Sequence, residues 1–304
     1  MKSNFLKVSL PDNSPRCTSP SMGLLLLFAL FAFFLILTPI LTQLLGRIIT
    51  RPEALMRVSM VVQDLLVFII PALVTAVAVT RLPARLLALD VKPYAFPTLM
   101  GIGALLCSVP VMNMVVEWNQ NLHLPESMAS VEDYMRQLEE SNTAMIDMLM
   151  KGASVGSLLV SVLIVGVLAG LSEELFFRGA LLRIIQATKI NMHLAIWLVA
   201  VIFSLLHFQM FGFVPRMLLG AYFGYLVWWT RSLWIPIIIH VFNNSLVVID
   251  SWIAANDSRS INTLCANPEN ALDWVGIVLS VLLTTACLIL IYRWGRGSSS
   301  IFEN

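Results

Sequence analysis

The stretch SEELFFRGALL, residues 172–182, places two acidic side chains and one basic side chain inside a long apolar run. Residues four apart share one face of a helix, so we expect Glu174 and Arg178 to form an ion pair. Glu173 points about 100° away, and its own fourth neighbour, Phe177, cannot neutralise a carboxylate. A carboxylate left in apolar surroundings is suited to proton transfer. The alternative is a structural polar cluster that holds helices together.

A histidine follows at a matching distance. Phe203 and His207 share one helical face in VIFSLLHF, and a turn is expected near Ile190. Glu173 lies 17 residues before Ile190 and His207 lies 17 residues after it. In an antiparallel hairpin, equal distance from the turn means equal depth. We therefore expect Glu173 and His207 to face each other across two helices, although a lone histidine on an apolar helix is more often a core residue.

A third polar group comes from IPIIIHVFNNSL, in which His240 and Asn244 share one helical face. A glutamate with a histidine can deprotonate a water molecule. A second histidine with an amide can hold the oxyanion of a tetrahedral intermediate. Alternatively, Glu173, His207 and His240 could ligate a zinc ion that keeps one position open for water. No compact HExxH spacing is present, so a metal-free and a zinc mechanism both stay open.

Membrane helices must position these residues. Of the 304 residues, 58% are hydrophobic and only 12% are charged, whereas soluble domains average about 25% charged. The net charge of +1 gives no indication of a nucleic-acid partner. A spanning helix needs about 20 mostly apolar residues. The long, unalternating runs predict an all-α polytopic bundle of about eight transmembrane helices, roughly Gly23–Gly46, Val58–Thr80, Pro97–Val116, Val155–Phe177, Met192–Phe208, Met217–Thr230, Trp234–Trp252 and Trp274–Tyr292.

An even number of spans puts both termini on one side of the membrane. That side receives 12 of the 19 lysines and arginines in this arrangement, which predicts that both termini are cytoplasmic. We expect four parts in the chain: a polar N-terminal tail over 1–22, transmembrane helices with an outer segment over 23–154, a catalytic membrane core over 155–293, and a C-terminal tail over 294–304.

The outer segment contains ASVEDYMRQLEESNTAMIDMLMKG, in which apolar residues recur at near-helical spacing. This pattern is typical of an amphipathic helix that lies on the outer membrane surface, and a solvated connector is the alternative. Its apolar positions are Val131, Met135, Leu138, Met145 and Met148.

Two acids and two glycine pairs complete the set of residues that stand out. Asp64 and Asp250 are placed near the outer ends of their expected spans, so we interpret them as interfacial or helix-pairing groups. Gly166 with Gly170, and Gly220 with Gly224, have the GxxxG spacing that permits close helix packing.

The three polar groups, taken in order, resemble the motifs of the CPBP family of intramembrane proteases. EELFFR reads as EExxxR, FSLLH as FxxxH, and HVFNN as HxxxN ending at Asn244. This family is also called the Abi or CAAX-protease family, and it includes the CAAX prenyl endopeptidases. The resemblance covers roughly residues 155–248, and each motif alone is weak.

The resemblance implies an α-helical intramembrane endopeptidase. By motif, Glu173 would activate water with help from His207, while His240 and Asn244 would stabilise the oxyanion. Glu174 and Arg178 would shape the site, and Phe203 would support it. The family is described both as metal-dependent and as using a metal-free glutamate mechanism, so zinc stays open, and a metalloprotease with it.

The expected substrate is a membrane-associated peptide or protein, and the lipid bilayer is the expected surrounding. Nothing in the chain identifies a eukaryote, so we expect a multi-pass protein of a bacterial cytoplasmic membrane. A non-catalytic immunity or scaffold protein of the same family is the alternative function. A transporter or proton relay is a third, although the halves show no inverted repeat of hydropathy.

Overall fold

The computed structural model describes residues 18–150, 154–188, 190–257 and 267–298. Every regular element within these ranges is helical, which agrees with the predicted all-α class. The elements are α1 (Pro20–Leu45), α2 (Pro52–Gln63), η1 (Asp64–Ile69), α3 (Ile70–Val79), α4 (Pro83–Leu86), α5 (Ala95–Gln120), η2 (Glu126–Met128), α6 (Ala129–Met150), α7 (Val155–Ser161), η3 (Val162–Leu168), α8 (Ala169–Glu174), η4 (Leu175–Leu181), α9 (Leu182–Ala187), α10 (Met192–Leu205), η5 (Met210–Gly212), α11 (Phe213–Thr230), α12 (Trp234–Asp257) and α13 (Ala271–Ser298).

Seven helical stretches of the described chain are long and apolar enough to cross a membrane. The chain is therefore a multi-pass membrane protein by length and composition. The expected eighth span is α10, which has 14 residues. At about 1.5 Å per residue it extends about 21 Å, short of the roughly 30 Å hydrocarbon core. The seven stretches are Pro20–Leu45, Pro52–Val79, Ala95–Gln120, Val155–Ala187, Met210–Thr230, Trp234–Asn256 and Ala271–Gly297.

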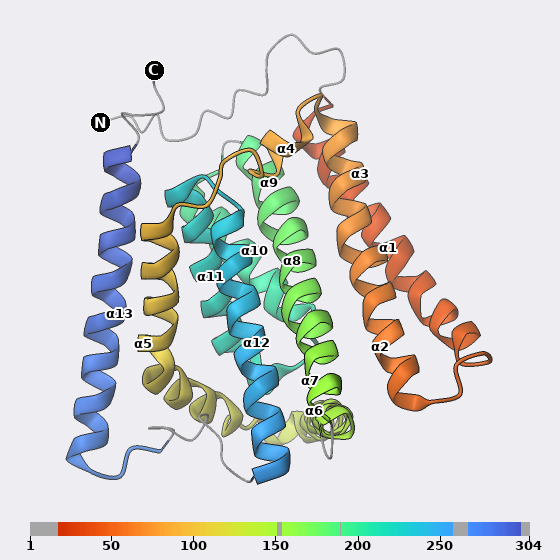
Figure 1. The fold of residues 1–304 in the computed structure, drawn as a ribbon, viewed down its shortest axis with the longest axis vertical. Helices are drawn as coiled ribbons and strands as arrows, with labels where there is room; N and C mark the ends of the chain where they lie inside the picture. The colour runs from red at the N-terminus through yellow and green to blue at the C-terminus, as the bar shows by residue number, and fades with distance from the viewer. Residues whose placement is uncertain (1–17, 151–153, 189, 258–266, 299–304) are drawn as a thin grey trace.

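The spanning helices form one bundle around a central group. Figure 1 shows α1, α2 and α3 along one flank, with α5 and α13 along the opposite flank. Helices α7 to α9, α10, α11 and α12 lie between them, and they carry the residues of the three sequence motifs except His207, which follows the end of α10. Helix α1 begins and α13 ends at the same end of the bundle (Figure 1). Helix α13 continues to Ser298, past the point where a tail was expected.

The helix that carries the two glutamates is continuous from Val155 to Ala187, but it switches between α-helical and π-helical geometry four times. The π-helical segments η3 and η4 flank the short α-helical segment α8, which ends at Glu174. A further π-helical segment, η1, begins at Asp64 in the second span. Single π-helical turns inside α-helices often occur at functional sites, and here they surround one region of the bundle.

Glycine allows the central helices to approach closely. A Cβ atom at Gly170 would lie 3.1 Å from the backbone nitrogen of Val241 in α12, and one at Gly166 would collide with Ser245. A Cβ at Gly224 would lie 2.8 Å from the Ile196 side chain of α10. The GxxxG spacings therefore serve helix packing, as the sequence indicated.

The outer segment contains the predicted helix, α6, which lies across the end of the bundle opposite to the start of α1 in Figure 1. Leu149 and Met150 at its end pack with Val248 of α12. Its start is held by Glu132, which accepts a 2.7 Å hydrogen bond from the Leu124 nitrogen. That hydrogen bond, followed by those from Arg136 and His123, lowers the pKa of Glu132 to about 2.

Candidate active site

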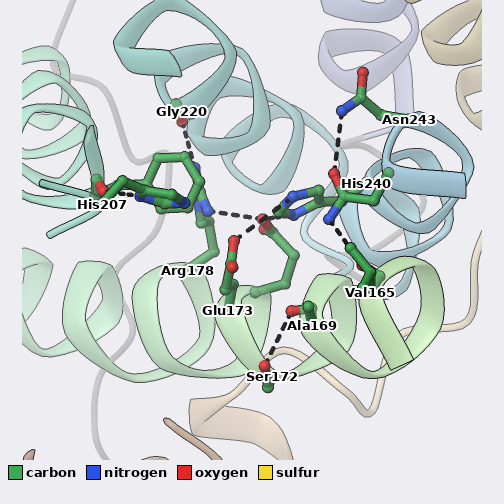
Figure 2. A network of polar contacts seen from close by, with 12 residues as sticks. Val165, Ala169, Ser172, Glu173, Arg178, His207, Gly220, His240 and Asn243 are labelled. Atoms are coloured by element: carbon green, nitrogen blue, oxygen red, sulfur yellow. Dashed lines mark hydrogen bonds and ion pairs between the residues drawn. The ribbon is translucent and has the colours of Figure 1, made fainter. Parts of the chain in front are cut away.

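Glu174 and Arg178 form the predicted ion pair in the interior of the bundle. Arg178 Nη1 lies 2.7 Å from Glu174 Oε1, and both side chains are fully buried. Arg178 Nη2 also donates to the Gly220 carbonyl oxygen at 2.9 Å, which ties α11 to the pair (Figure 2). The guanidinium lies 4.6 Å from the centre of the Phe203 ring, a cation–π distance. The pair thus links the helix Val155–Ala187 to α10 and α11.

His240 of α12 adds a second contact to the same carboxylate. Its Nδ1 lies 2.9 Å from Glu174 Oε1. The ring stacks on Phe223 with centroids 4.6 Å apart, and it is 2% exposed. Because an ionised carboxylate only accepts hydrogen bonds, Glu174 holds a hydrogen on Nδ1 of His240. Glu174 therefore positions both Arg178 and His240.

Glu173 lies on the other side of the His240 ring. Its Oε2 is 3.7 Å from His240 Nε2, and its side chain is 15% exposed, whereas that of Glu174 is fully buried. Figure 2 shows the carboxyl group of Glu173 pointing toward the gap between His207 and His240. Glu173 therefore has a partner in another helix, and it remains the more accessible of the two acids.

His207 follows the end of α10 and is held by its own chain. Its Nδ1 lies 2.8 Å from the carbonyl oxygen of Phe203. A carbonyl oxygen can only accept, so Nδ1 carries the hydrogen and the neutral ring has its lone pair on Nε2. Phe203, which is 1% exposed, packs edge-on against the His207 ring, with centroids 4.9 Å apart. His207 is thus oriented by a buried aromatic residue one turn earlier.

Asn244 lies one turn after His240 on α12, but its amide nitrogen contacts η3 and not the two glutamates. Its Nδ2 lies 3.4 Å from the Val165 carbonyl oxygen of η3. Its Oδ1 accepts a 3.2 Å hydrogen bond from Asn243 Nδ2 (Figure 2). In the described structure the Asn244 amide nitrogen is therefore engaged by the backbone of η3.

A pocket of about 430 Å³ opens beside Glu173. Glu173 and His207 both line it, so the two residues that the hairpin spacing placed at equal depth share one cavity. The central helices contribute Ile164, Val165, Ala169, Phe177, Leu206 and Phe208 to the lining, and the first two spans contribute Leu35, Thr38, Pro39, Met60, Gln63, Asp64, Val67 and Phe68. About half of the lining thus comes from helices that carry no sequence motif.

Asp64 pairs two helices, as one of its two sequence interpretations predicts, and it also lines the pocket. It lies within the helical stretch Pro52–Val79 and is 6% exposed. Its Oδ1 lies 3.1 Å from the hydroxyl oxygen of Ser172, the residue before Glu173. Its charge inside an apolar span marks Asp64 as a functional candidate, because ionisable residues in such places are usually functional. Asp250, in contrast, is buried on α12 away from the pocket lining.

The three candidate zinc ligands are not arranged as a metal site. Across the described residues, no group of three or more His, Cys, Asp or Glu side chains is placed to hold a metal ion. The hydrogen bonds at Nδ1 of His207 and of His240 are of the kind that orient a metal-ligating histidine, so the placement of the ligands and not these bonds decides the question. Their placement gives no support to a zinc centre formed by Glu173, His207 and His240.

Comparison with known proteins bears on this central region. Residues 155–246 match the family model described as type II CAAX prenyl endopeptidase Rce1-like. The matched residues run from the start of α7 into α12 and include Glu173, Glu174, His207, His240 and Asn244. The searches among curated proteins and among solved structures gave no match.

Proposed function

We propose that this chain, which carries a domain of the Rce1-like type II CAAX prenyl endopeptidase family over residues 155–246, is an endopeptidase that works inside the membrane. Its substrate would be a membrane-associated protein or peptide. The observation that carries the proposal is the division between the two glutamates. Glu174 is fully buried and committed to Arg178 and His240, while Glu173 is partly exposed and shares a pocket with His207.

Glu173 is the proposed general base. Its carboxylate takes a proton from a water molecule in the pocket as the water oxygen attacks the carbonyl carbon of the peptide bond. His207 presents the lone pair of Nε2, because Nδ1 donates to Phe203. That lone pair can accept a hydrogen bond from the same water and orient it.

His240 and Asn244 are the proposed stabilisers of the oxyanion. When the His240 ring is protonated, Nε2 carries a hydrogen that can be donated to the negative oxygen, and Glu174 at Nδ1 offsets the positive charge of the ring. Asn244 would leave its 3.4 Å contact with Val165 to donate from Nδ2. When the C–N bond breaks, the proton held by Glu173 passes to the leaving amine, and the glutamate regains its charge.

The membrane setting of the proposal follows from charge. We place both ends of the chain in the cytoplasm, since 12 of 19 lysines and arginines fall on that side when α10 is counted as an eighth, short crossing. The start of α1 and the end of α13 at one end of the bundle support an even number of crossings.

The proposal is tested by cleavage of synthetic peptides with purified protein in lipid nanodiscs. The probes are a farnesylated peptide with a CAAX ending and a degenerate peptide mixture, both read by mass spectrometry. We expect new termini with the wild-type protein and none with His207→Ala at the same folded concentration. Equal product from wild type and His207→Ala would overturn the assigned role of His207, and products from neither probe with wild type would count against protease activity.

A further inference from the structure

Asp64 is the acid of the pocket that the proposed mechanism does not use. It begins η1, is 6% exposed, and lines the cavity together with Glu173 and His207. Its Oδ1 is bonded to the Ser172 hydroxyl at 3.1 Å. Asp64 and Glu173 also interact electrostatically. The pocket therefore carries two carboxyl groups in a largely apolar wall.

The described pocket lining contains no lysine or arginine to balance these groups. Arg57, seven residues before Asp64 on α2, donates instead to the Ser157 hydroxyl. Arg178 and Arg216 each interact electrostatically with Glu173, but neither lines the pocket and neither acts on Asp64. A buried carboxylate without a cation is costly, and a ligand that brings a positive charge offsets that cost.

We propose that Asp64 forms a subsite for a basic side chain of the substrate, so that the enzyme selects peptides with arginine or lysine close to the cleaved bond. This inference rests on the proposed endopeptidase function. It names a substrate class that neither the three sequence motifs nor the matched region defines, because Asp64 lies outside residues 155–246.

The shape of the pocket suits such a side chain. Leu35 of α1 and Val67 and Phe68 of η1 line the walls, and they can cover the methylene stem of an arginine or lysine. The cavity of about 430 Å³ is within the range of small-ligand sites. With Ser172 on Oδ1, Oδ2 of Asp64 is available to the charged end. Glu173 on the same pocket would then place the reacting bond near the selected residue.

The test measures selectivity in nanodisc-embedded, full-length protein. Products of a degenerate peptide mixture are first mapped by mass spectrometry to find the positions that flank the cut. A matched pair of peptides then carries arginine or citrulline, its uncharged analogue of the same shape, at each flanking position. We expect wild type to prefer arginine at one position by at least about 10-fold in kcat/KM. In Asp64→Asn the ratio should fall to about one, while the citrulline peptide is still cleaved.

Two controls separate the possible failures. Asp250→Asn removes an equally buried acid, 6% exposed, outside the pocket, and should keep the arginine preference. Glu173→Gln should cleave both peptides on the order of 100-fold or more slower than wild type, and cleavage at the wild-type rate by that variant would refute the proposed function itself. If Glu173→Gln is slowed in this way but wild type shows no arginine preference, or if Asp64→Asn keeps the preference, only the basic subsite is overturned.

Discussion

At the scale of single residues, the two adjacent glutamates differ because their side chains point to different faces of one helix. The pairing of Glu174 with Arg178 could be predicted because both lie on one face, four residues apart. The contact between Glu174 and His240 could not, because 66 residues separate them and only the packing of α12 on α8 brings them together. The same is true of Glu173 and its 3.7 Å neighbour, His240.

Glu174→Gln is expected to damage stability more than any direct chemical step. The substitution leaves the fully buried Arg178 without its counter-ion, and breaking such a pair costs about 3–5 kcal/mol. Unfolding in mixed detergent micelles measures this loss. The double variant Glu174→Leu with Arg178→Met should recover part of it, because no buried charge remains. An unchanged unfolding midpoint in Glu174→Gln would contradict the structural role.

At the scale of helices, long apolar runs predicted where elements exist better than where they end. The first, third and last spans agree with their expected positions, while α10 is too short to cross alone. The π-helical segments beside Asp64 and Glu174 could not be predicted, because tertiary packing rather than residue type decides where a helix gains an extra residue per turn.

Close packing of α8 on α12 is expected to fail when Gly170 gains a methyl group. The added Cβ in Gly170→Ala would press on the Val241 backbone at 3.1 Å, directly beside His240. We expect a loss of about 1–3 kcal/mol in unfolding free energy together with reduced turnover, as His240 moves away from the glutamates.

Gly156→Ala is the matched control for Gly170→Ala. Its Cβ would meet nothing closer than the Ser154 hydroxyl at 3.8 Å, so stability should change by less than about 1 kcal/mol. Unfolding and turnover are measured on both variants in the same micelles. Equal unfolding free energies and equal turnover in the two variants would show that the close approach of α8 to α12 affects neither stability nor activity.

At the scale of the whole molecule, the pocket beside Glu173 is not confined to the part of the chain that carries motifs. The first two spans pack beside the central helices and supply half of the pocket wall, including Leu35 and Asp64. The motifs that resemble a protease family lie only in the central part of the chain. They therefore could not indicate that the first two spans line the pocket. This contribution emerges from the way α1 and η1 pack against α8 and η4, which no local pattern in the sequence encodes.

A larger side chain at a position of the pocket wall supplied by the N-terminal half should therefore slow catalysis. Leu35→Trp narrows the pocket, and we expect kcat/KM to fall on the order of 10-fold through weaker substrate binding. Ile36→Trp adds the same bulk at a neighbouring position that is 71% exposed and outside the lining. It should behave as wild type, and a similar loss in both variants would argue against a substrate pocket between α1 and α8.

The central claim concerns Glu173, and turnover per folded molecule in Glu173→Gln tests it most directly. This substitution keeps the size of the side chain and removes the proton acceptor, so cleavage should fall by on the order of 100-fold to 10,000-fold. Because Glu173 is the partly exposed acid, the unfolding midpoint should stay close to that of wild type. Cleavage at the wild-type rate by well-folded Glu173→Gln protein would contradict the account.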